Sequence, residues 1–377
     1  MTTTHLLLRV SWVALCALPS SWRGVGAQGP SRVGRTPEIT IGRNLSVWSE
    51  ILGEARPLQI YLPPSYDSSR DSYPVLYLLD GDRSFHHVTG IVEFLSGSGR
   101  IPEMIVVSVP NTDRSRDLTP PAPGAGSEVG GRADRFLRYL TDELAGWVGA
   151  NHRTQPFRVL VGHSRGGLFA IYALVHRPES FHGYIAASPA LWWNNRAVIH
   201  SARARLKRVP PPRFLYLTAG HESRTITETV PELTRLLEEV KPAGLEWKYR
   251  HLENENHYTT PHETVYDGLQ MTFAGWQVPE STILASGLEG VEAHYAAVTR
   301  KYGFPVRPPK GMMAWIGDFL LQQEKIEEAI AVRKRTAELY PRSAEVHFSL
   351  GGALERARRH EEASAAYRKA YSLLINW

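Results

Sequence analysis

The stretch Val159-Leu160-Val161-Gly162-His163-Ser164-Arg165-Gly166-Gly167 decides the fold. It holds a Gly-x-Ser-x-Gly pattern between a short apolar run, Arg158–Val161, and an apolar stretch of helical character, Leu168–Val175. Such a run predicts a buried strand, and the stretch after the glycine pair predicts a helix. A serine on a sharp strand-to-helix turn stands above the sheet, and the glycines are needed because a Cβ there would clash with backbone. The stretch therefore predicts a nucleophile elbow with Ser164 as the nucleophile.

On both sides of this turn, apolar or β-branched runs alternate with helical patterns. This alternation predicts a mostly parallel, doubly wound α/β sheet, in which ligands bind at the carboxyl ends of the strands. Strands are expected at Leu58–Leu62, Val75–Leu79, Met104–Val109, Arg158–Val161, Tyr184–Ala187, Phe214–Leu217 and Trp247–Leu252. Helices are expected at Arg135–Val148, Leu168–Val175 and Val230–Val240.

A serine hydroxyl needs a histidine base within hydrogen-bond reach. For this kind of turn the chain order is serine, then acid, then histidine, with the histidine in a loop after the last strand. His257 meets this condition, because it closes the polar loop that starts at Glu253. His262, which follows Pro261, is the second choice. His163 is next to the serine in sequence, but its side chain is expected to point away and to pack.

The acid that orients the base is expected in the loop after the preceding strand. Glu222 is the carboxylate closest behind Phe214–Leu217. Its role would be to hold the tautomer of His257 and to stabilise the imidazolium ion. The alternatives that remain open are Glu253, Glu255 and Asp117.

Two backbone N–H groups are expected to bind the oxyanion. One belongs to Arg165, directly after the nucleophile, and the other to Asp82, in the stretch Leu78-Leu79-Asp80-Gly81-Asp82. Gly81 would let the backbone turn there and would border the substrate. Asp80 and Asp82 could instead bind a metal, but no matching His/Asp cluster accompanies them. We therefore predict neither a metal nor a cofactor.

The first 27 residues predict a signal peptide. An apolar run, Leu6–Leu18, follows a short start, and Val25-Gly26-Ala27 supply the small residues before a cleavage site. The run is too short and interrupted for a stable membrane span. We expect a secreted or periplasmic protein whose mature chain starts with a tail, residues 28–37.

Composition excludes several classes of function. The chain has 377 residues, of which 42% are hydrophobic and 21% charged, as in globular proteins. Its net charge of +5 is scattered, which argues against nucleic-acid binding. The single cysteine, Cys16, lies in the predicted signal peptide. A mature chain without it has no disulfide, no cysteine-bound zinc and no cysteine nucleophile.

The C-terminal part predicts a small all-helical region. Residues 277–310 look like a connector with one helix, Gly290–Lys301, and residues 311–377 contain an internal repeat. Four pairs share an offset of 34 residues, and Pro341 closes the first unit: Gly317 and Gly351, Ala329 and Ala363, Ile316 and Leu350, Leu320 and Leu354. The offset matches the tetratricopeptide unit. Two units are fewer than a free-standing array needs, so they are expected to pack on the first domain, to self-associate or to bind a protein partner.

Taken together, five segments resemble the esterase D and enterochelin-esterase-like family of α/β hydrolases. They are Tyr73-Pro74-Val75-Leu76-Tyr77-Leu78-Leu79-Asp80-Gly81, Arg116-Asp117-Leu118-Thr119-Pro120, Gly162-His163-Ser164-Arg165-Gly166-Gly167, Ser188-Pro189-Ala190-Leu191-Trp192-Trp193 and Asn256-His257. The resemblance implies an α/β-hydrolase fold over residues 38–276, sometimes followed by a tetratricopeptide-like tail. It also implies hydrolysis of a small-molecule carboxylic ester through an acyl-enzyme, here with a Ser-His-Glu triad. An acyltransferase with the same triad, or an inert hydrolase-fold protein whose repeats bind a partner, are the alternatives.

Two features leave the substrate open. Arg165 stands where relatives often carry an apolar or aromatic residue. Its charge would either favour an anionic substrate or pair with a nearby carboxylate. Trp192 and Trp193 would either wall a pocket for an aromatic or acyl group or pack beneath the site.

Overall fold

The structure is a computed structural model of the chain, and it describes residues 39–121 and 131–375. The predicted signal segment, with Cys16, and the predicted tail lie outside the described residues. What the sequence predicts for them therefore stays a prediction.

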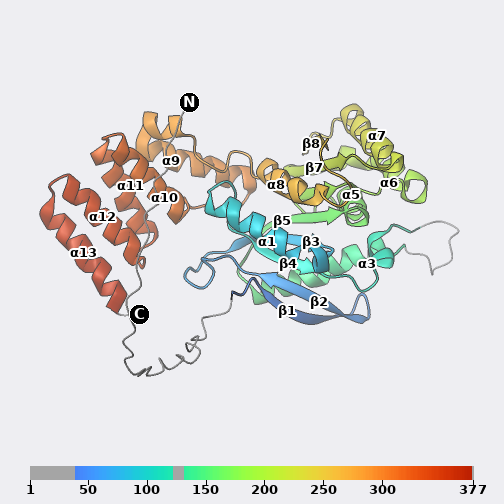
Figure 1. Cartoon of the computed structure of the whole chain (residues 1–377), viewed down its shortest axis with the longest axis horizontal. Coiled ribbons are helices and arrows are strands. Elements are labelled where there is room, and N and C mark those ends of the chain that lie inside the picture. The colour runs from blue at the N-terminus through green and yellow to red at the C-terminus, as the bar shows by residue number, and fades with distance from the viewer. Residues whose placement is uncertain (1–38, 122–130, 376–377) are drawn as a thin grey trace, which may run out of the picture. The chain divides into compact units, whose positions relative to one another are not determined.

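Within the described residues, eight strands form one sheet in the order β1-β2-β4-β3-β5-β6-β7-β8 (Figure 1). The strands from β4 to β8 in this order are parallel, whereas β2 pairs antiparallel with both β1 and β4. The bounds are β1 Arg43–Ser49, β2 Glu54–Tyr61, β3 Tyr73–Leu79, β4 Ile105–Val109, β5 Thr154–His163, β6 Gly183–Ala187, β7 Arg213–Gly220 and β8 Leu245–Leu252. The predicted doubly wound α/β sheet is confirmed.

Helices cover both faces of this sheet, and each face has its own apolar core. One face carries α2 (Arg114–Leu118), α3 (Ala133–Arg138), a π-helical turn η1 (Tyr139–Leu144), α4 (Ala145–Asn151), α5 (Arg165–His176), α6 (Trp193–Arg205), a 3₁₀ turn η2 (Leu206–Arg208) and α7 (Arg224–Val240). The other face carries α1 (Gly81–Gly97), α8 (Thr260–Thr272) and α9 (Glu280–Tyr302). None of the helices in the described part of the chain is long and apolar enough to cross a membrane.

Strand β3 shows why the runs of the central strands are apolar throughout. Its residues Val75, Tyr77 and Leu79 belong to the core on one face, and Leu76 and Leu78 belong to the core on the other. Successive side chains of a strand point to opposite faces, so a strand with helices on both sides needs apolar residues at every position. The central strands are therefore visible in the sequence.

The sequence patterns do not predict β1, α1, α6 and most of α8. Strand β1 is an edge strand with mostly exposed or half-buried side chains, so it lacks an apolar run. The start of α1 is polar, and its buried residues Val88, Ile91, Val92 and Leu95 follow only afterwards. Their helical spacing is the signal that could have revealed the helix.

Helices α10 (Lys310–Gln322), α11 (Ile326–Leu339), α12 (Ala344–Arg356) and α13 (His360–Ile375) follow one another in two hairpins. Gly317 of the first hairpin lies against Arg333, and Gly351 of the second lies against Tyr367. Both glycines thus face the residue sixteen positions later, as a repeat requires. That the hairpins are tetratricopeptide units that bind a partner stays a prediction.

The helical region shares a core with the sheet. The described residues from Ile41 onward form one compact unit. The ring of Phe157 in β5 is fully buried, and its centroid lies 5.3 Å from that of Phe273, 5.6 Å from Tyr302 in α9 and 5.8 Å from Phe304. The strand that leads to Ser164 is therefore packed directly against the start of the C-terminal helices.

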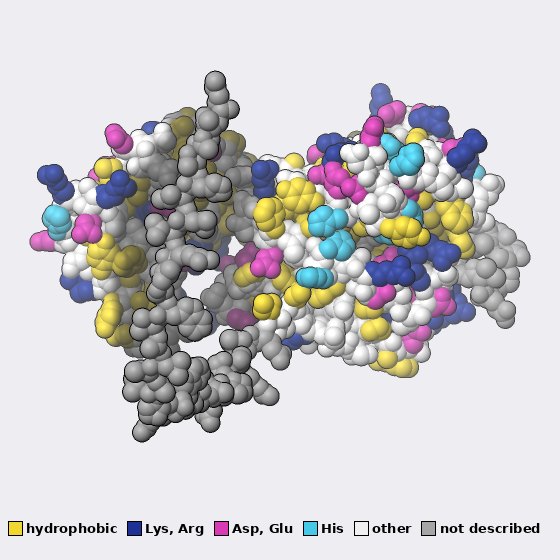
Figure 2. Space-filling view, viewed as in Figure 1, with side chains coloured by type: hydrophobic (Ala, Val, Ile, Leu, Met, Phe, Trp, Pro, Cys, Tyr) yellow, Lys and Arg dark blue, Asp and Glu magenta, His cyan; other side chains and the backbone are white. Residues whose placement is uncertain are grey.

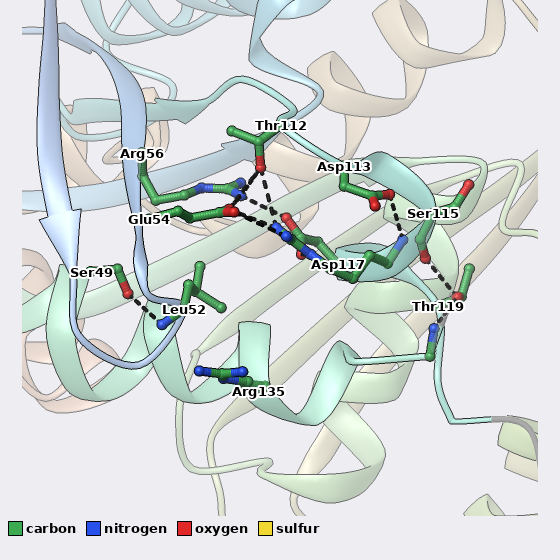
Figure 3. Close-up of polar contacts among 12 residues, drawn as sticks. Ser49, Leu52, Glu54, Arg56, Thr112, Asp113, Ser115, Asp117, Thr119 and Arg135 are labelled. Atoms are coloured by element: carbon green, nitrogen blue, oxygen red, sulfur yellow. Dashed lines mark hydrogen bonds and ion pairs between the residues drawn. The ribbon is translucent and has the colours of Figure 1, made fainter. Parts of the chain in front are cut away.

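A buried ion network fixes α2 next to strand β2 (Figure 3). Arg56 of β2 donates to Asp117 at 2.7 Å and to Glu54 at 2.7 Å, and Arg116 donates to Asp117 at 2.6 Å and to Glu54 at 2.6 Å. The side chains of Arg56 and Asp117 are only 1% and 3% exposed. The hydrogen bond from Arg116, opposed by burial, lowers the pKa of Glu54 to about 2. This network holds α2, whose Ser115 reaches the site described below.

Removal of a carboxylate from this network is expected to destabilise the folded protein, because the buried charge of Arg56 would then be less well compensated. We expect Asp117→Leu to lower the free energy of unfolding by about 3–5 kcal/mol. The double variant Arg56→Met/Asp117→Leu is the control, and it should regain most of this loss, since no buried charge then lacks a partner. Urea unfolding followed by circular dichroism measures both. A double variant as unstable as the single one would contradict this account.

Stability is also expected to fall in acid. Burial lowers the pKa of His87, His163, His176 and His182 to about 4 in each case. The folded protein keeps these rings neutral, whereas the unfolded chain takes up protons as the pH falls through about 6.5. Stability is therefore complete above that value and is lost progressively between about pH 6.5 and 4.

The midpoint of urea unfolding, measured across that pH range, checks this expectation. The matched variant is His176→Phe, because the His176 ring stacks on Tyr172 at 4.2 Å and a phenyl ring can take its place. It should make the loss of stability shallower. A midpoint that does not change with pH in the wild type would refute the explanation.

Candidate active site

Ser164 lies between β5 and α5 in a backbone conformation that side chains rarely adopt. Its φ is 58° and its ψ is −113°. Its N–H donates to the Ala187 carbonyl at 2.9 Å, and its carbonyl accepts from the Ala190 N–H at 3.0 Å. A Cβ at Gly162 would overlap the backbone of Gly166. These contacts keep the turn tight, since a non-glycine residue at positive φ persists only where its surroundings impose it.

The structure brings Ser164, His257 and Glu222 together. His257 lies in the loop between β8 and α8, and Glu222 lies in the loop between β7 and α7. The His257 Nε2 is 3.1 Å from the Ser164 Oγ, and its Nδ1 is 2.6 Å from the Glu222 Oε2. The three residues follow the parallel strands β5, β7 and β8, so residues far apart in sequence meet at the carboxyl edge of the sheet.

Glu222 is held by further donors, and its side chain is 1% exposed. Its Oε1 accepts from the Gly220 N–H at 2.7 Å and from the Ser188 hydroxyl. Ser188 has a φ of 44°, and its hydroxyl oxygen is also 2.8 Å from the hydroxyl oxygen of Thr260. Burial on its own would raise the pKa of Glu222, but the hydrogen bonds from His257, Ser188 and Gly220 outweigh it, so that the pKa lies below its usual value. The carboxylate is thus ionised at neutral pH.

Sequence reasoning did not select Ser188 and Thr260. The available signal was the position of Ser188, which starts Ser-Pro directly after β6. The contact of Thr260 with it depends on how α8 is placed, and the sequence does not give that placement.

The other two histidines considered occupy different places. The His163 Nε2 is 2.6 Å from the backbone carbonyl oxygen of His257, so its ring supports the loop and does not reach the Ser164 hydroxyl in any described contact. The His262 ring lies 5.5 Å from the ring of His87. Of the alternative acids, Asp117 belongs to the ion network above, and Glu253 is exposed.

The two residues expected at the oxyanion each lie in the first turn of a helix. Arg165 starts α5 and Asp82 is the second residue of α1. First-turn N–H groups have no partner within their own helix, and the positive end of the helix dipole favours a negative charge there. A Cβ on Gly166 would lie 3.1 Å from the Asp80 Oδ2, so the two helix starts are close together.

Asp80 has its own partner. The guanidinium of Arg114 donates to its two carboxylate oxygens at 2.5 and 2.8 Å, and also donates to the His163 carbonyl at 3.1 Å. Asp82 accepts from the side-chain amide of Asn111 at 3.2 Å. Nowhere in residues 39–121 and 131–375 do three or more His, Cys, Asp or Glu side chains gather in a way that could hold a metal ion.

A cavity of about 770 Å³ borders the loop that carries His257, although neither His257 nor Ser164 is part of its lining. Its lining includes His163 and Tyr258, which are the sequence neighbours of Ser164 and His257. The other lining residues are Asp80, Arg83, Ser84, His87, Arg114, Glu255, Thr259, Pro261, His262, Glu263, Tyr266 and Asp267. Four of these residues are carboxylates and three are histidines. Figure 2 shows such a grouping of histidine side chains, in cyan, among acidic and hydrophobic ones on the face that it draws.

The three residues expected to border the substrate do not line this cavity. Gly81 is buried, and a Cβ there would overlap the Ser108 hydroxyl, so its role is in backbone packing. Trp193 packs partly against the core, and Trp192 is 40% exposed. The Cζ of Arg165 lies 5.7 Å from the centre of the Trp193 ring, which in turn lies 6.1 Å from the centre of the Trp192 ring.

Comparison with known proteins places this arrangement in a family. Residues 49–277 match the model of the Esterase family, described as "Putative esterase". A siderophore enterobactin esterase of Emericella nidulans is 35% identical, over 43% of this chain and 62% of that protein. A siderophore triacetylfusarinine C esterase of Aspergillus fumigatus is 33% identical, over 40% of this chain and 57% of that protein. The matched region thus spans less than two thirds of the length of these two curated relatives.

Solved structures share the fold. An IroE-like serine hydrolase from Shewanella oneidensis is 26% identical, with a TM-score of 0.70, and the match covers 79% of this chain and 99% of the other. A protein of Capnocytophaga ochracea, 17% identical with a TM-score of 0.63, covers 88% of this chain and shares the fold. The family model matches more than half of the chain, and the sheet, the turn at Ser164 and these neighbours agree with it. This chain therefore belongs to the Esterase family, in its enterochelin-esterase-like group of α/β hydrolases.

Proposed function

We propose that this protein is a serine esterase that cleaves a small-molecule carboxylic ester through an acyl-enzyme. The observation that carries the proposal is the hydrogen-bonded chain from the Ser164 hydroxyl through His257 to Glu222. A nucleophile, a base and a group that orients the base, each within hydrogen-bond reach of the next, are what acyl transfer by serine requires. Membership in the Esterase family supports the same chemistry.

The proposed reaction has two halves. The His257 Nε2 takes the proton of the Ser164 hydroxyl while the Oγ attacks the ester carbonyl. The N–H groups of Arg165 and Asp82 donate to the oxyanion that forms. The intermediate then expels the alcohol, which receives the proton from His257, and leaves an acyl ester on Ser164. In the second half water takes the place of the serine hydroxyl, and the acid is released.

Glu222 would make His257 an effective base. A carboxylate at the Nδ1 keeps the proton on that nitrogen, so that the lone pair of the Nε2 faces Ser164. The same negative charge stabilises the imidazolium ion once the proton has moved. Ser188 and Thr260 would act as positioning residues, because the hydroxyl of Ser188 binds the other carboxylate oxygen.

The substrate would be a small molecule. The relatives are named as esterases of siderophores, which are small-molecule esters, and the cavity near His257 has room for part of such a ligand. We further propose that the protein acts outside the cytoplasm, as its predicted signal segment suggests. A second function for the helical region has no specific support within the described residues.

The nucleophile can be tested directly. A fluorophosphonate probe is expected to label the wild-type protein and to leave Ser164→Ala unlabelled, because only an activated serine reacts. Loss of the attacking oxygen is also expected to lower the kcat for 4-nitrophenyl butanoate by about 10⁴–10⁶-fold. Mass spectrometry of the labelled peptide identifies the site. Equal labelling of the two proteins would rule out this nucleophile.

The acid can be tested against an exposed glutamate that is close to His257 in the sequence. Glu222→Gln keeps the shape but removes the charge and permits the wrong tautomer of His257, so we expect the kcat to fall by about 10²–10⁴-fold. Glu253→Gln is the matched control, since Glu253 is exposed and makes no described contact with His257. If the kcat fell further in Glu253→Gln than in Glu222→Gln, the assignment of Glu222 as the acid would be wrong.

A further inference from the structure

The guanidinium of Arg165 is a cation beside the nucleophile without a described counter-ion. It is half-buried, its Nη1 donates to the Ser115 hydroxyl at 2.6 Å, and its Cζ lies 5.7 Å from the centre of the Trp193 ring. No carboxylate oxygen of residues 39–121 or 131–375 lies within 4.0 Å of it. The nearby Arg114 and Arg116, by contrast, are each paired with a carboxylate.

This local arrangement leaves donors unused. A guanidinium has five N–H donors in a planar fork, and the described hydrogen bond takes one of them. The Ser115 oxygen receives that bond, which leaves its own O–H free to donate to a bound group. A partly desolvated charge without an ionic partner is unfavourable in the empty site, and an anion that binds there removes the penalty.

Trp193 and Trp192 form an aromatic wall next to this cation. Their ring centres are 6.1 Å apart, and Trp192 is 40% exposed. The wall is fixed at its base, because the indole N–H of Trp193 donates to the Pro120 carbonyl at 3.4 Å. The next three residues, 194–196, all have positive φ values, of 46°, 48° and 64°. Such strain persists only where the surroundings impose it, and it is concentrated at functional sites.

The two sides of the site differ in charge. The cavity near His257 has four carboxylates (Asp80, Glu255, Glu263 and Asp267) and two arginines (Arg83 and Arg114) in its lining. Asp80 is paired with Arg114, and Glu263 and Asp267 share the single guanidinium of Arg250, so negative charge is in excess there. An anionic substrate group would be repelled on that side and attracted on the side of Arg165. The difference gives a bound ester one preferred orientation.

From these observations we infer that Arg165, Ser115 and Trp193 form an anion-binding subsite, and that the preferred substrates are esters with a carboxylate or similar anion on a flat apolar body. The inference rests on the proposed serine esterase function and adds the substrate class. It assigns the Arg165 side chain to specificity, in addition to the part proposed for its backbone N–H.

Two pairs of esters that differ only in charge test it. In 4-nitrophenyl hydrogen adipate and 4-nitrophenyl adipamate, a carboxylate or a neutral amide is on the acyl side. In 4-carboxyphenyl butanoate and 4-carbamoylphenyl butanoate, it is on the alcohol side. For wild type we expect the anionic member of one pair to have a kcat/KM about 10- to 100-fold higher than its amide, as for hydrogen bonds to charged groups. The pair that shows the preference identifies the side that faces Arg165.

Variants then assign the preference to the side chain. Arg165→Gln should bring the ratio within that pair to about one, and Arg165→Lys should keep part of it, because an ammonium retains the charge without the fork. Added salt should lower the wild-type ratio. The control is Arg224→Gln, which removes an equal charge from a side chain that is 92% exposed on α7 and should keep the wild-type ratio. Because the ratio is taken within each variant, a general loss of activity does not affect it.

Failure of this inference is distinguishable from failure of the proposed function. A wild type that hydrolyses both members of each pair equally, or an Arg165→Gln variant that keeps the preference, overturns the subsite alone. A wild type that hydrolyses none of the four esters and is not labelled at Ser164 overturns the esterase proposal and the subsite with it. If Arg165→Gln does not fold, the Arg165→Lys ratio and the salt dependence of the wild-type ratio decide.

Discussion

The strained turn at Ser164 is the constraint on which the rest of the structure depends. A positive φ at a serine is unfavourable in isolation. It is maintained here by backbone contacts to Ala187 at the end of β6 and to Ala190 in the loop after it, and by the absence of a Cβ at Gly162. The close approach of strand and helix at this turn requires the helices on that face to pack against the sheet, which the core around α5 provides. The position of the hydroxyl is thus set by the fold as a whole.

The charges around this turn are arranged in separate pairs. Glu222 is buried but has a donor for each carboxylate oxygen, and Arg56 and Asp117 neutralise each other out of contact with solvent. Buried charges are tolerated when they are paired and hydrogen-bonded, and each pair then fixes the geometry of its surroundings. Arg165, one residue after Ser164, differs from these groups, because the described partner of its guanidinium is a hydroxyl group and not a carboxylate.

The sequence predicted the sheet and the three residues that the structure brings together, for a physical reason in each case. Central strands buried on both faces must be apolar, and Ser164 and Glu222 follow two such strands, β5 and β7. His257 follows the edge strand β8, whose side chains alternate between apolar and polar. The edge strand β1 could not be predicted in this way, because half of its surface faces solvent. The contact of Ser188 with Thr260 joins segments that are far apart in the sequence. Such contacts depend on how the segments are placed in three dimensions, and short-range sequence patterns do not contain that information. The sequence also does not predict the turn at residues 194–196, for the same reason.

The aromatic cluster around Phe157 has a consequence for how this protein could change over time. The ring belongs to the strand that ends at the nucleophile, and its neighbours Tyr302 and Phe304 belong to the segment that starts the helical region. The part of the chain that holds Ser164 and the helical part are therefore not independently packed domains joined by a linker. Recombination that exchanges or lengthens the last helices is compatible with this fold only if the junction falls after Phe304. An earlier junction would remove the rings that cover Phe157 and would expose an apolar patch prone to aggregation.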